Sequence, residues 1–376
     1  MSPRAIPTLT RSEARAWLLG CTALCGPLPP ARPPASRALL AALRCIQLDP
    51  LDRIGTNADL VAMARLDGLR RGELLEHLFP GYAFEHFAKE RCLLPAAAFP
   101  HYREQAAETP WWRLGERLKR LPSGLIEDVL AEVRARGPLT PGELSHRGRV
   151  EALDWAGWKG TGRASTMALE VLWTRCEVVV CGRRGREKCY DLPARALPEL
   201  ASQRVTEPFG RWALRERVEA AGLLCTAGGP QWSMLAEART SPLPAHMVAE
   251  GALAEVRVEG SRRTFLAPPD LCARSFPQDD DGRMRILGPL DPLLWDRKLV
   301  DQIFGFDYVW EVYKPAAQRR WGWYVCPLLH HGHLVGRIEA HREGRRLVLD
   351  RLWEEDGHAL DRRALKEALG RHEAGM

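Results

Sequence analysis

The stretch RASTMALEVLWTRCEVVVCGRRGREKCYDL, residues 163–192, decides the fold predicted for this chain. Apolar residues recur with helical spacing over its first half, which predicts a helix from Arg163 to Cys176. An apolar run, a basic turn and a return segment follow, and this order predicts a β-hairpin. The turn holds four cations within six residues, namely Arg183, Arg184, Arg186 and Lys188. The stretch therefore predicts a helix leading into a hairpin with a cationic tip.

Two further helices are predicted immediately before this one. Apolar spacing over residues 123–137 predicts a helix with Ser123 as its N-cap. Thr140-Pro141 then begins a short second helix, because proline is favoured in the first helical turn. Three helices followed by a hairpin predict a winged helix. We expect its third helix to lie in a DNA major groove and its tip to contact phosphates, with a solvated charged turn as the alternative for the tip.

Weaker patterns of the same kind flank this unit. Upstream, a helix from Thr10 or Ser12 to about Cys25 is followed by a proline-rich loop, and Ser36 is the predicted N-cap of a second helix. An extended segment and a helix over 57–69 follow. This order is compatible with a helix-turn-helix derivative.

Downstream, helices over 211–224 and 247–253 precede a second hairpin over 254–266, with Arg262 and Arg263 near its tip. Strands are then predicted over 285–288, 310–313, 321–326, 334–338 and 346–349, with a closing helix over 350–373. The predicted fold class is α+β, with tandem winged-helix domains and a C-terminal β-rich part. The predicted domains are 1–120, 121–205, 206–280 and 281–376.

Composition bounds the class of protein. A chain of 376 residues with a net charge of +6 is long enough for two or three units and permits a polyanionic partner without indicating one. The ten cysteines form no C-x-x-C pair, and no acidic or cysteine partner is spaced to complete a metal site with the histidines of His330-His331-Gly332-His333. We therefore predict reduced thiols, no metal and no cofactor. The apolar run before Cys21 is too short for a secretion signal and no run is long enough for a membrane span, so a cytoplasmic protein is expected. The sequence has no clear interface signature, so a monomer is expected.

The segment Cys45-Ile46-Gln47-Leu48-Asp49-Pro50 carries the candidate chemistry. In an extended segment Gln47 and Asp49 point the same way, while Ile46 and Leu48 face the other side. An amide beside a carboxylate can position and polarise one water molecule. An edge strand with two solvent-facing polar residues is the alternative interpretation.

Several segments together resemble the winged-helix DNA glycosylases of the YcaQ/AlkZ type in order and spacing. They are Gln47–Pro50, Phe84–Glu90 with Leu94-Pro95, Pro292–Arg297, Phe304–Tyr308, Glu311–Tyr313 and Arg320–Leu329. The resemblance spans nearly the whole chain and implies tandem winged helices with a β-rich C-terminal part. It also implies excision of alkylated bases, crosslinked ones included, from duplex DNA, with Gln47 and Asp49 as the catalytic Gln-x-Asp pair.

The chemistry of this pair suits base excision. Hydrolysis of an N-glycosidic bond passes through an oxocarbenium-like sugar, which an ionised Asp49 can stabilise while it activates water. A purine alkylated on its imidazole nitrogen is already cationic and needs no general acid to leave. Gln47 would orient the water or hold the lesion nucleotide. A monofunctional glycosylase that leaves an abasic site is expected, and a non-catalytic winged-helix DNA-binding protein or transcriptional regulator is the alternative.

The predicted DNA contacts are all cationic. They are Arg65, Arg163, Arg183, Arg184, Arg186, Lys188, Arg262, Arg263 and Arg320. The chain departs from the resembled family at three positions near the expected DNA path. It has Thr56 and Ala58 where many members carry Arg and His, and Lys89 where a His often follows Ala. These departures bear on the range of lesions.

Overall fold

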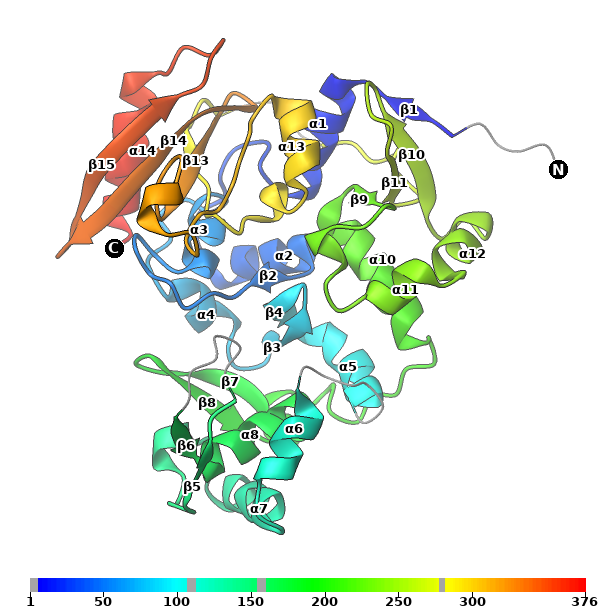
Figure 1. The fold of residues 1–376 in the computed structure, drawn as a ribbon, viewed down its shortest axis with the longest axis vertical. Coiled ribbons are helices and arrows are strands. Elements are labelled where there is room, and N and C mark those ends of the chain that lie inside the picture. Colours follow the sequence, from blue (N-terminus) through cyan, green and yellow to red (C-terminus); the bar gives the residue numbers. More distant parts are fainter. Residues whose placement is uncertain (1–5, 107–112, 154–159, 277–280) are drawn as a thin grey trace. The chain divides into compact units, whose positions relative to one another are not determined.

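A computed structural model describes residues 6–106, 113–153, 160–276 and 281–376 (Figure 1). The chain divides into two compact units. Unit 1 comprises Met1–His77, Phe87–Cys92 and Gly210–Met376, and unit 2 comprises Leu78–His86 and Leu93–Phe209. Helices and small sheets occur in both, so the α+β class is confirmed.

The two units combine segments that the sequence assigns to separate domains. The predicted limit at 205/206 lies close to the division at Phe209 and Gly210, whereas the predicted limit at 120 matches no division. The predicted limit at 280 falls on residues 277–280, which lie outside the described residues. Strands β3 (Ala83–Ala88) and β4 (Glu90–Pro95) each contain residues of both units, and the chain crosses between the units within them.

Unit 1 begins with short elements that lie on both sides of the candidate catalytic segment in the sequence. They are β1 (Thr8–Leu9), α1 (Arg11–Cys21), α2 (Pro33–Leu43), β2 (Ile46–Gln47), α3 (Asn57–Met63) and α4 (Glu73–Leu78). Thr10 caps α1 as predicted, in a reciprocal capping box with Glu13. The predicted cap at Ser36 is wrong, because the proline pair at the start of α2 begins the helix earlier. Ser36 is buried inside α2, and its Oγ lies 2.8 Å from His77 Nδ1.

The middle of unit 1 contains the second predicted hairpin. Its elements are α10 (Phe209–Ala221), β9 (Leu224–Cys225), α11 (Ala236–Thr240), α12 (Leu243–Ala249), β10 (Ala254–Val258) and β11 (Thr264–Ala267). The sheet order is β1-β10-β11-β9, and β1 pairs in parallel with β10, Leu9 opposite Val258. The N-terminal strand thus extends a sheet formed by residues far along the chain (Figure 1).

A four-stranded sheet and two helices form the C-terminal part of unit 1. They are β12 (Arg285–Ile286), α13 (Arg297–Phe304), β13 (Val325–His330), β14 (His333–Glu343), β15 (Arg346–Glu354) and α14 (Arg362–Ala374). The sheet is antiparallel in the order β12-β13-β14-β15, and α13 shares a core with α1 through Val300 and Trp17. The predicted strand over 310–313 is wrong, because this segment is a loop. Strand β15 also continues to Glu354, so the closing helix begins later than predicted.

Unit 2 holds the elements predicted as the winged helix, in the predicted order. They are α5 (Phe99–Ala106), α6 (Leu114–Arg120), α7 (Leu125–Arg136), the 3-10 turn η2 (Pro141–Glu143), β5 (Arg149–Glu151), β6 (Thr161–Arg163), α8 (Ala164–Thr174), β7 (Val179–Arg184), β8 (Glu187–Asp191) and α9 (Pro193–Ala196). Gly124, not Ser123, is the N-cap of α7. The predicted second helix is only the turn η2, closed by a capping box between Thr140 and Glu143.

The burial of α8 contradicts the predicted position of this helix in a major groove. Nine of its eleven residues are buried, and the other two, Thr166 and Glu170, are half-buried. A helix that reads base edges needs a polar face open to DNA. Helix α8 has none, so it is a core helix of unit 2. A helix that is apolar on all sides is expected to be buried in this way.

Within the parts of the chain that the structure describes, every helix is too short or too polar to cross a lipid bilayer.

Candidate active site

The candidate catalytic segment is a strand of two residues followed by a turn. Gln47 ends β2 and is buried, with 8% of its surface exposed. The Leu48 N–H donates to the Arg91 carbonyl at 2.8 Å, which aligns the segment with β4. Asp49 lies beyond the strand and is half-buried, and its Oδ1 accepts the Leu51 N–H at 2.9 Å. The alternation that places Gln47 and Asp49 on one strand face therefore does not extend to Asp49.

Two hydrogen bonds hold Gln47. Its side-chain Oε1 accepts from Lys89 Nζ at 2.8 Å, and its backbone carbonyl accepts from Asn57 Nδ2 at 2.8 Å. Because Lys89 Nζ is the donor of this bond, the amide carbonyl points at Lys89 and the amide NH₂ points the other way. Gln47 is thus fixed in one orientation, in which Nε2 is its donor to any ligand. An edge residue that merely faces solvent would not be held like this.

Burial shapes the charges of the site. It raises the pKa of Asp49 above its usual value of 3.8, and the hydrogen bond from the Leu51 N–H lowers it only in part. Burial also lowers the pKa of Lys89, which is 7% exposed. The Lys89 Nζ lies 5.2 Å from the centre of the Trp295 ring, within cation–π range. Both side chains are therefore held where the neutral form is favoured relative to water.

Two tyrosines lie within the electrostatic reach of Asp49. Burial raises the pKa of the Tyr313 and Tyr324 hydroxyls, and the charge of Asp49 raises both further. Tyr324 is buried, whereas Tyr313 is 67% exposed, the largest value among the exposed large hydrophobic side chains of the described residues. An aromatic ring near the candidate carboxylate is thus open to a ligand.

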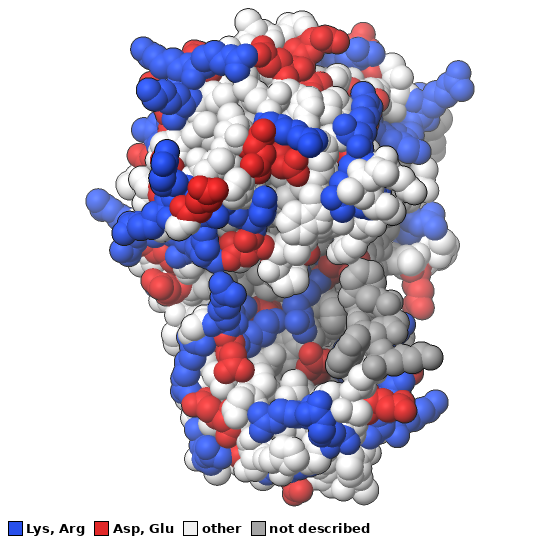
Figure 2. All heavy atoms as spheres, turned by 60° about the vertical axis from the view of Figure 1, so that its left-hand side comes forward, with Lys and Arg blue, Asp and Glu red and all other residues white. Residues whose placement is uncertain are grey.

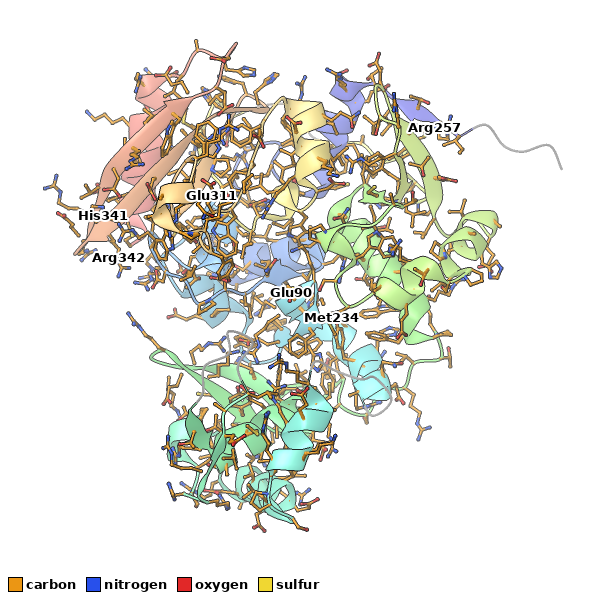
Figure 3. The ribbon with its side chains drawn as sticks, in the orientation of Figure 1. Glu90, Met234, Arg257, Glu311, His341 and Arg342 are labelled. Carbon is orange, nitrogen blue, oxygen red and sulfur yellow. The ribbon has the colours of Figure 1, made fainter. Side chains whose placement is uncertain are left out.

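Glu311 fixes the loop that carries Tyr313. Its carboxylate is buried and accepts the backbone N–H groups of Arg320 at 3.1 Å and Trp321 at 2.7 Å, and Lys314 Nζ at 2.9 Å. Burial by itself raises the pKa of Glu311, but these donors outweigh it and lower the pKa to about 2. The position of Glu311 is labelled in Figure 3. These bonds also explain why residues 310–313 form a loop and no strand.

Glu90, the residue after Lys89, forms a second polar cluster. Ser233 Oγ donates to Glu90 Oε1 at 2.6 Å, and Arg217 Nη1 donates to the Ser233 carbonyl at 3.0 Å. Figure 3 shows Glu90 close to Met234, whose side chain is 39% exposed. Glu90 and Met234 both have a positive φ, of 61° and 64°, which non-glycine residues seldom adopt. Such strained residues cluster at functional sites.

Arg65, a predicted DNA contact, is a structural residue. It is 2% exposed, and its guanidinium forms two hydrogen bonds with Asp291, at 2.7 and 2.9 Å. It also donates to the carbonyls of Thr22 and Val61. These four bonds use the guanidinium within the core, so the prediction for Arg65 is wrong.

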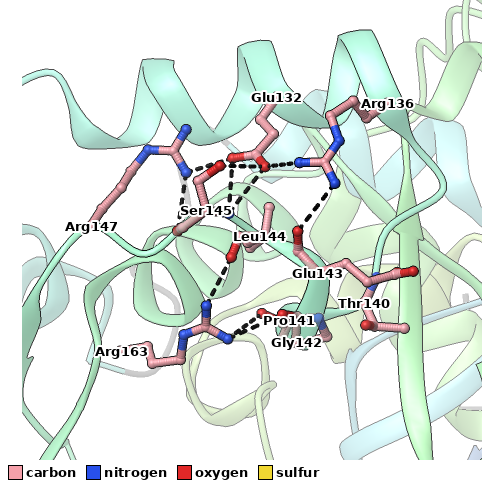
Figure 4. Close-up of polar contacts among 10 residues, drawn as sticks. All are labelled: Glu132, Arg136, Thr140, Pro141, Gly142, Glu143, Leu144, Ser145, Arg147 and Arg163. Atoms are coloured by element: carbon pink, nitrogen blue, oxygen red, sulfur yellow. Dashed lines mark hydrogen bonds and ion pairs between the residues drawn. The ribbon is translucent and has the colours of Figure 1, made fainter.

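Arg163 is likewise engaged within unit 2. Its guanidinium donates to the carbonyls of Pro141 at 3.1 Å, Gly142 at 3.4 Å and Leu144 at 2.8 Å (Figure 4). The same close-up shows Glu132 accepting from Ser145 and Arg147, the latter at 2.5 Å. Arg163 thus closes the loop around η2, and this role accounts for its position before α8.

The hairpin β7–β8 is confirmed, but most of its cations are paired. Arg183 and Lys188 both bind the carboxylate of Glu85, which is 1% exposed, with Lys188 Nζ at 2.6 Å. Arg184 pairs with Glu143 and donates to the Pro138 carbonyl. Arg186 at the tip is exposed and has no hydrogen bond or ion pair with another described residue. The tip therefore offers phosphate one cation that is not already paired.

The remaining predicted DNA contacts lie in unit 1. Arg262 is exposed, whereas Arg263 binds Asp296 at 2.9 Å and lies over the Phe265 ring. Arg320 is exposed, pairs with Asp307 at 2.6 Å and lies over the Trp321 ring. Arg320 and Tyr313 lie in the same loop and are both exposed. Arg320 is a predicted DNA contact, whereas Tyr313 is not among the predicted contacts.

Sequence reasoning missed the roles of Lys89, Tyr313 and Asn57. Lys89 was identified only as a departure from the resembled pattern, and Tyr313 only as part of a motif. Asn57 is the first residue of α3, a position where asparagine is common and does not by itself indicate a functional role. Thr56 and Ala58, the other departures, are the N-cap of α3 and a buried core residue. The three missed residues are linked to the site by interactions with Gln47 and Asp49, from which they are distant in sequence. The spacing of residues within one segment does not reveal such interactions.

No group of three or more His, Cys, Asp or Glu side chains within the described ranges is arranged to hold a metal ion. His330 and His333 face each other at the β13–β14 turn, and His333 Nδ1 lies 3.4 Å from Arg15 Nη1. Lys and Arg side chains are spread over the face shown in Figure 2 and are interspersed with Asp and Glu. Charge alone therefore does not mark one DNA-binding patch on this face.

Two comparisons place the chain among known proteins. The solved structure of Streptomyces sahachiroi DNA glycosylase AlkZ matches with a TM-score of 0.59 and 17% sequence identity, over 98% of this chain and 97% of that chain. At this identity the match establishes the shared α+β fold. A family model described as DNA glycosylase AlkZ-like matches residues 40–374. The chain belongs to the AlkZ-like DNA glycosylase family, and DNA is accordingly its substrate.

Proposed function

We propose that this protein hydrolyses the N-glycosidic bond of alkylated purines in duplex DNA, with water as the nucleophile. The observation that carries the proposal is the pairing of a half-buried Asp49 with an orientation-locked Gln47 on one short segment. Base excision with water as the nucleophile leaves an abasic site as its product. Crosslinked purines are among the candidate lesions.

Asp49 would act on the sugar and on water. Its carboxylate stabilises positive charge developing at C1′ and accepts a proton from the attacking water. The raised pKa of Asp49 makes its carboxylate a stronger base than that of an ordinary aspartate. The same shift means that Asp49 is protonated at a higher pH than an ordinary aspartate. An N-alkylated purine carries its own positive charge, so the site needs no acid to protonate the leaving base.

Gln47 would position the reactants. Because Lys89 holds its Oε1, the Nε2 group donates to the water, to a sugar oxygen or to the lesion. A donor at this point cannot take a proton from water, which leaves that role to Asp49. The amide is therefore a positioning group, and its value lies in its fixed direction.

The exposed ring of Tyr313 would bind the DNA near the lesion. Aromatic side chains stack on nucleobases with little sequence preference. Tyr313 is presented by a loop that also carries the exposed Lys314 and Arg320, which suit phosphate contacts. The burial of α8 counts against the alternative function as a winged-helix regulator, because such a protein reads DNA with that helix.

The decisive experiment measures base release from a duplex with one 7-methylguanine, followed by alkaline cleavage of the abasic product. Wild type should release the base, and Asp49→Asn should lose turnover while its affinity for the duplex changes little. Asp52→Asn is a control in the same loop, because Asp52 pairs with Arg71. Retained turnover in Asp49→Asn would refute the assignment, and DNA binding without base release by wild type would favour the regulator. A panel of lesions, including a crosslink, then defines the range.

A further inference from the structure

Lys89 is chemically unusual in this chain. The sequence has 47 arginines and 7 lysines, so arginine is its normal cation. Six lysines lie in the described residues, and Lys89 is the buried one among them, with 7% exposure. Arginine remains charged in proteins, whereas a buried lysine can lose its proton and act as a nucleophile. A lysine at this position therefore suggests amine chemistry.

The surroundings of Lys89 favour that chemistry. Its Nζ donates to Gln47 Oε1 at 2.8 Å, and no carboxylate of a described residue forms an ion pair with it. Burial lowers its pKa, and the neighbouring charge of Arg217 also lowers it, whereas Cys92, Glu90 and Cys45 oppose this in part. The hydrogen bond to Gln47 holds the Lys89 amine next to the side-chain amide that is proposed to contact the sugar.

Trp295 completes this environment. Its ring lies below the Lys89 Nζ at 5.2 Å, and its Nε1–H is buried without an acceptor among the residues that the structure describes. A cationic intermediate formed at Nζ would keep the favourable contact with the indole face. The indole N–H is a buried donor that a bound ligand could satisfy.

We propose that Lys89 gives the protein a second activity, a β-lyase that cleaves DNA at the abasic site left by base excision. The inference rests on the proposed function, because hydrolysis at C1′ produces a sugar aldehyde beside Gln47. The neutral Lys89 amine attacks the C1′ carbonyl carbon of the ring-opened sugar and forms a carbinolamine. The carbinolamine hydroxyl takes one proton from solvent, water leaves, and an iminium ion forms between Nζ and C1′.

The strand is then cleaved by elimination. The C2′ proton passes to solvent, and its bonding electrons form the C2′=C3′ double bond. The C3′–O bond breaks, and the phosphate leaves as the 5′ end of the downstream strand. Water hydrolyses the imine, which returns the Lys89 amine and releases an unsaturated aldehyde on the upstream strand. Every step needs only water and the abasic site.

The test uses the full chain and a duplex with a single abasic site prepared by excision of uracil. This substrate needs no glycosylase activity, so failure of the lyase and failure of the proposed excision are separable. Sodium borohydride reduces the iminium ion and traps a covalent protein–DNA adduct. Wild type should form the adduct and cleave the strand, and peptide mapping by mass spectrometry should place the DNA on Lys89.

Variants sharpen the result. Lys89→Arg keeps a cation but should lose both adduct and cleavage, whereas Lys366→Gln, at an exposed lysine of α14, should keep both. Thermal unfolding and binding to a reduced abasic analogue check that Lys89→Arg is folded. If wild type traps no adduct, if the adduct maps to another amine, or if folded Lys89→Arg still cleaves, the proposal is overturned. The mapping on wild type decides the question even if the variant does not fold.

Discussion

The candidate site holds its two ionisable groups where charge is costly. Asp49 is half-buried with a raised pKa, and Lys89 is buried with a lowered one. Opposite shifts of this kind are typical of functional sites, because a group poised between its two protonation states can move a proton. Stability and function therefore compete at Asp49, and this competition can be measured.

We expect Asp49→Asn to be at least as stable as wild type at pH 7. A raised pKa means that folding favours the protonated carboxyl, so wild type loses stability as pH rises through the pKa of Asp49. The asparagine is neutral and keeps an acceptor for the Leu51 N–H. The gain should be below about 1 kcal/mol and should vanish below the usual aspartate pKa. Denaturant unfolding at pH 7 and pH 3.5 measures it, and a less stable variant at pH 7 would contradict the assigned shift.

The pH dependence of activity follows from the same shift. Base release requires the ionised Asp49, so the rate should fall as pH drops through a pKa above 3.8. Single-turnover rates between pH 4 and pH 8 give this pKa. A rate that stays constant down to pH 4 would show that no group with a raised acidic pKa is needed.

At the scale of elements, the loop between Glu311 and Trp321 is a rigid support for Tyr313. We expect Tyr313→Leu to weaken binding of the lesion duplex by about 1–3 kcal/mol, the usual cost of losing one stacked ring. Tyr313→Phe should bind like wild type, since it keeps the ring. Fluorescence anisotropy in the Asp49→Asn background, which is expected to lack turnover, measures affinity separately from base release. Equal affinities for the Leu and Phe variants would exclude stacking by this residue.

The hairpin β7–β8 is expected to contribute fewer phosphate contacts than its four cations suggest. Arg183, Arg184 and Lys188 are already paired with carboxylates, so Arg186 should be its main phosphate contact. Arg186→Gln is expected to reduce the slope of log affinity against log salt concentration by about 0.9, the contribution of one phosphate contact. Arg204→Gln, at an exposed arginine of the same unit outside the hairpin, is the matched control. Equal slopes for wild type and Arg186→Gln would remove the hairpin tip from the interface.

Local patterns explain which elements could be predicted from sequence. Both hairpins were predicted because alternating apolar residues and a polar turn are local signals. The sequence of α8 is apolar on all sides, which is a local signal for burial, but the prediction of a groove-binding helix relied on the order of three helices and a hairpin. The loop at Glu311 was not predictable, because it depends on bonds to backbone groups nine and ten residues away.

The same limit applies to the site. Gln47 and Asp49 are predicted from their spacing in a short apolar run, and their catalytic roles stay a proposal. Lys89 was seen only as an unexpected residue, because its bond to Gln47 joins positions 42 residues apart. A spacing argument works within one strand or helix, whereas contacts between distant segments require the fold.

At the scale of the whole molecule, the cysteines report on burial. All ten are free, and Cys272 is the exposed one, while Cys25 and Cys181 are half-buried. A thiol reagent such as Ellman's should therefore react quickly with about one thiol in the native protein and with all ten after unfolding, since thiolates must be accessible to react. Cys272→Ser should remove the fast phase. Rapid reaction of several thiols in native protein would show that the described packing is incomplete.

The chain enters unit 2, returns to unit 1 for Phe87–Cys92, and enters unit 2 again. Lys89, whose amine is proposed to cleave abasic DNA, thus lies in a six-residue segment of unit 1 between two segments of unit 2. Shortening the gene to remove unit 2 would delete this segment along with it. Evolutionary loss or exchange of unit 2 would face the same obstacle, because any replacement must reconnect the chain twice on either side of Lys89.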